Sequence, residues 1–170
     1  MKPLILLLAL AILTVGCVKV PPTVQPVQNF DASRYLGTWY EIARLENSFE
    51  TGLEQITAQY SLRDDGGLRV INRGYDPAEK SWKSAEGKAF FVGSPTEGRL
   101  KVSFFGPFYG AYNIISLGEN YAYALVCGPD YSYLWILSRT PQLPDTALKP
   151  LVAKAKALGF DVAKLIFVKQ

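Results

Sequence analysis

Few residues in this sequence could perform covalent chemistry. The chain has two cysteines, Cys17 and Cys127, and no histidine. Without histidine neither a serine–histidine triad nor an imidazole metal site can form, and two cysteines are too few for a zinc cluster. A lipid-modifying enzyme, which stays as an alternative, would need Cys127 as its nucleophile, although no neighbouring base would activate it. The sequence favours a binding protein without metal or cofactor, with Cys127 as a buried thiol.

Other side chains could bind a ligand without reacting with it. The polar candidates carry hydroxyl or amide groups inside apolar segments and can donate or accept hydrogen bonds; they are Tyr60, Asn72, Tyr112 and Tyr123. The apolar candidates are Ala58, Val70, Ala89, Phe91, Val102, Phe104, Ile114, Leu125, Trp135 and Leu137. Such a lining suits an alkyl chain, because each buried methylene contributes about 0.8 kcal/mol.

These candidates recur at every second position of short segments, which is the periodicity of β-strands. Turn residues separate the segments, most clearly at Asp64-Asp65-Gly66-Gly67. The predicted strands lie near 39–45, 56–62, 68–75, 83–92, 99–105, 111–117, 121–127 and 133–139. They predict an all-β fold, an eight-stranded antiparallel up-and-down β-barrel whose interior can hold one small ligand.

Parity assigns the interior of this barrel, because residues two apart on a strand share a face. Starting from Trp39, the first strand continues inward with Glu41 and Ala43. Small inward residues leave room for a ligand: Ala43, Ala58, Gly87 and Ala89. If larger side chains filled that room, the protein would be a structural envelope protein with a solid barrel, and this alternative stays open.

One outer face of the barrel needs a cover, because Ile42, Ile115 and Ile136 are apolar at the opposite parity. The sequence predicts one C-terminal α-helix packed outside the barrel over Asp145–Leu158, with Asp145 as its cap and Gly159 ending it. A short strand is predicted to follow over Leu165–Val168.

The N-terminus has the form of a secretory signal, with an apolar run from Leu4 to Val15. Residues 1–16 resemble a bacterial lipoprotein signal peptide, which implies cleavage before Cys17, acylation of Cys17 and anchoring in the outer membrane with the barrel facing the periplasm. A plain secretory signal is the alternative. Residues 17–28 contain three prolines and are predicted to form an extended tether, reaching about 30 Å.

The order of elements from residue 29 to 170 resembles the lipocalins. Gly37-Thr38-Trp39-Tyr40 matches the first motif of that family, and Arg139 matches the arginine that packs over the motif's tryptophan at the closed end. The resemblance therefore implies a structural contact between Arg139 and Trp39. Glu41 is expected to face the same end, where a buried carboxylate needs a partner such as Arg139.

The resemblance also implies a function. Bacterial lipocalins bind one fatty acid or lysophospholipid for storage or transport in envelope maintenance, so we expect the tail inside and the head group at the mouth. Nucleic-acid binding is excluded, because the net charge is only +3 and no basic stripe is present. Phe108 and Tyr109, with Phe49 and Leu53, are expected at the mouth, where they could gate the cavity, contact a membrane, join two subunits of a homodimer or fold back on the core.

Overall fold

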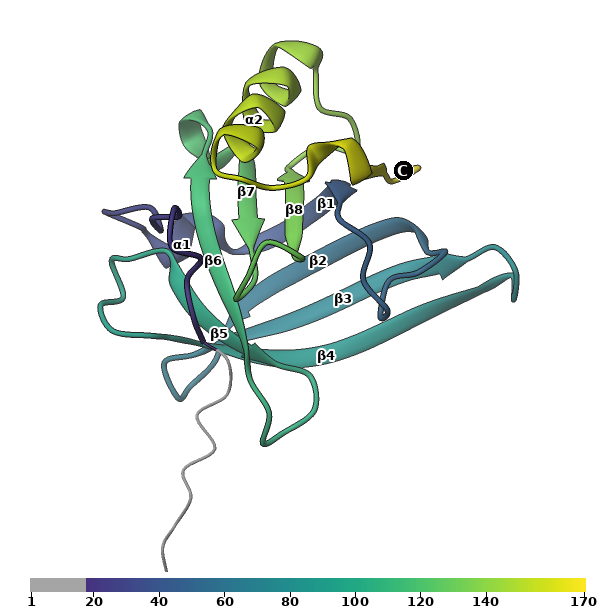
Figure 1. Cartoon of the computed structure of the whole chain (residues 1–170). Helices are drawn as coiled ribbons and strands as arrows, with labels where there is room; N and C mark the ends of the chain where they lie inside the picture. The colour runs from purple at the N-terminus through teal and green to yellow at the C-terminus, as the bar shows by residue number, and fades with distance from the viewer. Residues whose placement is uncertain (1–17) are drawn as a thin grey trace, which may run out of the picture.

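The sheet closes into a barrel in the computed structural model, which describes residues 18–170 (Figure 1). Eight strands pair antiparallel in chain order, and pairing of β2 with β1 closes the ring. They are β1 (Gly37–Arg44), β2 (Glu54–Leu62), β3 (Leu68–Asp76), β4 (Ser81–Phe91), β5 (Arg99–Ser103), β6 (Gly110–Leu117), β7 (Tyr123–Cys127) and β8 (Leu134–Ser138). The short β9 (Ile166–Phe167) adds to β1. The predicted eight-stranded barrel is confirmed.

The helix α2 (Asp145–Ala157) covers one outer face of the barrel, as predicted (Figure 1). Leu151 and Ala155 are its buried residues, and Gly159 follows it with φ +103°. The expected cap is wrong: Pro144 occupies the N-cap, and Asp145 is the first helical residue. No helix within residues 18–170 is long and apolar enough to cross a bilayer.

The buried hydrophobic residues form two clusters, one inside the barrel and one outside it. The inner cluster fills the closed end of the barrel and includes Phe30, Tyr35 and Trp39. Tyr35 comes from α1 (Ala32–Tyr35), a single turn that the sequence did not predict; two 3-10 turns, η1 (Glu119–Tyr121) and η2 (Val162–Lys164), complete the chain. The outer cluster lies between the sheet and α2. The barrel is therefore solid at one end.

The segment 18–28 lies against the barrel wall, although the sequence predicts an extended tether. Its Val24 is buried in the outer cluster, and the Val27 backbone donates to Ile114 O (2.8 Å) and accepts from Gly98 N (2.8 Å). Thr23 contributes a side-chain bond to Leu158 O at 2.5 Å. The free reach of about 30 Å expected for an extended segment is therefore not realised.

The closed end is held by the predicted contact between Arg139 and Trp39. The guanidinium carbon lies 3.9 Å from the centroid of the indole ring. The same guanidinium donates to Thr38 O at 3.0 Å and Arg34 O at 2.7 Å. Gly37 has φ +92°, which a residue with a Cβ rarely adopts, so the backbone can turn beneath Trp39.

Arg139→Ala is expected to lower the free energy of unfolding by about 2 kcal/mol, because it removes a cation–π contact and charged hydrogen bonds to carbonyls. Urea denaturation measures this loss. Arg34→Ala is the control, because Arg34 also stacks on a ring, that of Tyr121 at 4.4 Å, but at an exposed position. Equal losses in the two variants would contradict the special role of Arg139.

Candidate functional site

The mouth half of the barrel encloses a cavity of about 640 Å³. Loops after β1, β5 and β7 surround its opening, as an up-and-down meander requires. Most of the predicted residues line it: Ala58, Tyr60, Val70, Asn72, Val102, Phe104, Tyr112, Trp135 and Leu137. Because apolar side chains dominate this lining, the cavity can accommodate a hydrocarbon chain.

Three predicted lining residues, Ala89, Phe91 and Ile114, lie outside the cavity. They face inward as expected but belong to the closed-end cluster, where the Phe91 ring packs 6.1 Å from that of Phe30. The prediction is wrong because it treated the barrel as hollow along its whole length. Of the small residues, Gly87 is covered by Phe104, so an added Cβ there would lie 2.8 Å from that ring.

Tyr123 and Leu125 are also absent from the cavity, because the predicted parity of β7 is wrong. Both pack in or against the outer cluster, and the inward residues are Ala124 and Val126. Ala43 lies in the outer cluster too, since a register shift between Glu41 and Ala43 moves it out of phase. Bulges of this kind leave no signal in an alternating pattern.

Hydroxyl groups of three tyrosines meet at the floor of the cavity. Tyr60 donates to the Tyr112 hydroxyl at 2.8 Å, and the hydroxyls of Tyr112 and Tyr35 lie 2.7 Å apart. Burial raises the pKa of Tyr112 well above its ordinary value, with the neighbouring tyrosines adding to the effect. The floor is therefore neutral, and its hydroxyls largely satisfy one another.

A buried charged cluster occupies the cavity wall near the mouth. Arg44 is 2% exposed and donates to Glu41 Oε1 at 3.1 Å and to the Glu50 carbonyl at 2.7 Å. The Glu50 carboxylate accepts from Trp135 Nε1 at 3.0 Å. The expected partner of Glu41 is thus wrong, because Arg44 rather than Arg139 pairs with it, and Glu41 lines the cavity.

Sequence reasoning missed Glu50, Arg73 and Lys83, all of which line the cavity. Glu50 lies in the loop after β1, where no periodicity could place it. Lys83 lies on β4 near the mouth, where its ammonium pairs with Glu79, and Arg73 lies on β3, where its guanidinium carbon is 4.2 Å from the centroid of the Trp82 ring.

Burial raises the pKa of Glu41 well above its ordinary value of 4.5, the Glu50 carboxylate raises it further, and Arg44 opposes both. Above pH 4.5 the unfolded chain releases this proton while the folded chain holds it, so folding stability falls as pH rises up to the folded pKa. Glu41→Gln is expected to remove this fall, which is at most about 1.4 kcal/mol per pH unit. Urea denaturation between pH 4.5 and 7.5 measures it, with the exposed Glu119→Gln as control. An unchanged pH profile in Glu41→Gln would refute the assignment.

Cys127 is buried beneath α2 in the outer cluster and does not line the cavity. Burial raises the pKa of its thiol to about 12. The predicted buried thiol is confirmed, and a nucleophile at this position could not reach a ligand. Cys17, the predicted acylation site, lies outside the described residues.

The aromatic loop residues at the mouth divide into two groups. Tyr109 folds back, with the Lys101 ammonium 5.0 Å from its ring centroid and the Phe90 ring at 6.3 Å. Phe105 and Phe108 are 80% and 72% exposed, and both line the opening of the cavity. Of Phe105, Phe108 and Tyr109, only Tyr109 therefore folds back against the barrel wall.

Comparisons with known proteins agree on the architecture. The model of the family described as "Lipocalin-like domain" matches residues 30–170. Outer membrane lipoprotein Blc of Escherichia coli (strain K12) is 58% identical over 170 residues, covering 99% of this chain and 96% of that protein. Apolipoprotein D of Rattus norvegicus is 35% identical over 148 residues, covering 82% and 77%. Insecticyanin from the tobacco hornworm Manduca sexta superposes with a TM-score of 0.72 at 22% identity, covering 89% and 87%.

Proposed function

The chain belongs to the lipocalin family, and from this premise we propose that its barrel binds one fatty acid or lysophospholipid, with the tail in the cavity and the head group at the mouth. The observation that carries this proposal is the apolar cavity of about 640 Å³, open at one end and closed at the other. This role agrees with the family, whose members are binding proteins rather than enzymes.

Polar groups near the opening support the placement of the head group. Lys83 lines the mouth and pairs with the exposed Glu79, and its ammonium could exchange this partner for a carboxylate or phosphate of the ligand. Inside, Val70, Val102 and Phe104 offer apolar surface to a tail. The other alternative, a structural protein whose barrel is solid, would not contain such a cavity.

The outer membrane is the location of this protein, by its similarity over nearly its whole length to outer membrane lipoproteins. The finer proposal is that residues 1–16 are removed, that Cys17 is acylated and that the barrel faces the periplasm. An acylated Cys17 with two or more chains would meet the requirement for stable anchoring.

Native mass spectrometry of the full chain, extracted from outer membranes in mild detergent, tests both parts. We expect one bound fatty acid or lysophospholipid per protein, and a covalent mass showing acyl chains on Cys17 and loss of residues 1–16. A protein that remains lipid-free after incubation with excess palmitate and lysophosphatidylethanolamine would contradict the binding proposal. An unmodified Cys17 would contradict the anchor alone.

A further inference from the structure

The outer wall formed by β4 and β5 is basic. Lys88 on β4, Arg99 and Lys101 on β5, and Lys19 beside them form what we call the basic wall. None of these four pairs with an acidic side chain among residues 18–170. Of the acidic groups on neighbouring strands and turns, Glu86 and Asp65 are paired with Arg69 and Arg63, both at 2.6 Å, whereas Glu97 and Asp64 make no ion pair within the described part of the chain and offset only part of the charge of the four cations. The wall therefore carries unbalanced positive charge.

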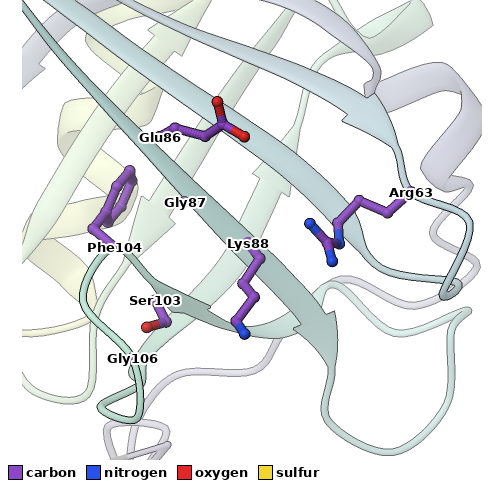
Figure 2. Close-up of a pocket in the computed structure, with 7 residues that line it drawn as sticks. All are labelled: Arg63, Glu86, Gly87, Lys88, Ser103, Phe104 and Gly106. Carbon is purple, nitrogen blue, oxygen red and sulfur yellow. The ribbon is translucent and has the colours of Figure 1, made fainter.

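A groove of about 200 Å³ opens on this wall, with Lys88 and Arg63 along it and Ser103 next to Lys88 (Figure 2). Ser103 lies opposite Lys88 in the β4–β5 ladder and is only 4% exposed. Its Oγ has no hydrogen-bond partner. A buried hydroxyl without a partner is costly, and a phosphate oxygen held by the Lys88 ammonium could satisfy it.

The chain leaves the domain on the same wall. Arg99 donates to the Val18 carbonyl at 3.3 Å, and Asn113 donates to the Lys19 carbonyl at 3.2 Å. Cys17 directly precedes Val18, and one residue reaches at most about 3.6 Å. An acyl group on Cys17 would therefore hold this wall, rather than α2, next to the lipid.

Exposed aromatic side chains adjoin the basic wall. The loop that follows β5 carries Phe105 and Phe108, which are mostly exposed. Figure 1 shows this loop projecting from the barrel on the side where the described chain begins. Basic residues beside exposed aromatic residues are a combination that binds to the interface of an anionic membrane.

We propose that the basic wall docks on an anionic phospholipid leaflet, with a head-group phosphate in the Lys88–Ser103 groove and Phe105 and Phe108 in the interface. This inference rests on the anchor at Cys17 and is independent of which lipid the cavity binds. In this orientation the lip of the mouth formed by Phe105 and Phe108 touches the leaflet, so a lipid can pass into the cavity without crossing water.

Quenching of tryptophan fluorescence by brominated phospholipid tests the docking. The full chain, extracted from membranes, is reconstituted into vesicles of phosphatidylglycerol and brominated phosphatidylcholine. Phe108→Trp should add fluorescence that brominated lipid quenches. Phe167→Trp is the matched control, because Phe167 is also exposed, on β9 beside β1 and away from the basic wall, and the fluorescence added there should stay unquenched. Equal quenching at the two positions, or none at position 108, would overturn the proposal.

Charge removal tests the electrostatic part in the Phe108→Trp background. Lys88→Gln with Lys101→Gln should lower the ratio of docked to undocked protein roughly 25-fold, about fivefold for each lysine, in anionic vesicles. Lys149→Gln with Lys156→Gln on α2 removes the same charge from another face and should have no effect. The same response to both pairs would refute docking through the basic wall. The palmitate affinity of the Lys88/Lys101 variant should stay unchanged, and its intact mass shows whether Cys17 is acylated. A loss of docking can therefore be distinguished from a loss of ligand binding and from a missing anchor.

Discussion

Ala58→Trp is expected to lower the affinity for palmitate about 100-fold, because the indole would occupy the depth of the cavity that the tail needs. Ala58 lines the cavity and pairs with Trp39 on β1 and Asn72 on β3. Each methylene displaced costs about 0.8 kcal/mol, so displacing three or four is sufficient for this loss. Isothermal titration calorimetry of the delipidated protein measures the change.

Gln59→Trp is the matched control for this variant. Gln59 is the next residue on β2, is exposed and lies on the opposite face of the strand. Its palmitate affinity should match that of the unmodified chain. Thermal unfolding of both variants shows whether the barrel is intact. Undiminished binding by a folded Ala58→Trp variant would mean that the tail lies elsewhere.

Arg44→Met is expected to lower the free energy of unfolding by about 3–5 kcal/mol at neutral pH. The substitution removes the cation that lies between Glu41 and the buried Glu50 carboxylate, and a buried charge without its partner is strongly destabilising. Methionine retains much of the side-chain volume, so the loss reports charge rather than a cavity. Urea denaturation measures it.

A second substitution distinguishes charge from packing in this variant. Adding Glu50→Gln to Arg44→Met should recover part of the stability, because the carboxylate left without its cation is removed. The exposed pair of Arg69 and Glu86 supplies the control, and Arg69→Met should have a much smaller effect. No recovery on adding Glu50→Gln would show that the cost comes from packing.

The sequence is sufficient to predict the barrel and its closed end, and the reasons are local. Short alternating segments separated by turn residues specify antiparallel strands, and the outcome at β3 shows this: Leu68 and Val70 are buried while Arg69 between them is exposed. The contact of Arg139 with Trp39 was predicted from the resemblance to the lipocalins, whose first motif matches Gly37-Thr38-Trp39-Tyr40.

The cavity lining is predicted less well than the fold. Alternation shows which face of a strand points inward, but it does not show how far along the barrel axis a residue lies. Ala89 faces inward, yet side chains from the segment before β1 fill the barrel at its level. In β7, residues Ala124, Leu125 and Val126 are all buried, since one face meets the inner cluster and the other meets the outer cluster. When both faces of a strand are apolar, the residue pattern does not show which face points into the barrel.

The N-terminal segment and the loop after β1 were missed for a related reason. Val24 and Glu50 belong to irregular segments whose contacts come from tertiary packing, with partners far along the chain: Val24 in the outer cluster and Glu50 at Trp135. Neither alternation nor turn chemistry predicts such contacts. The buried cluster of Glu41, Arg44 and Glu50 therefore became visible only with the structure.

The tyrosine floor sets a maximum length for the acyl chain that the cavity can enclose. Tyr35, Tyr60 and Tyr112 close the cavity at a fixed level, and their mutual hydrogen bonds keep that level from yielding. Along a homologous series of fatty acids, affinity should climb by about 0.8 kcal/mol per methylene until the terminal methyl reaches this floor. Beyond that length each added methylene must remain outside, and the gain ends.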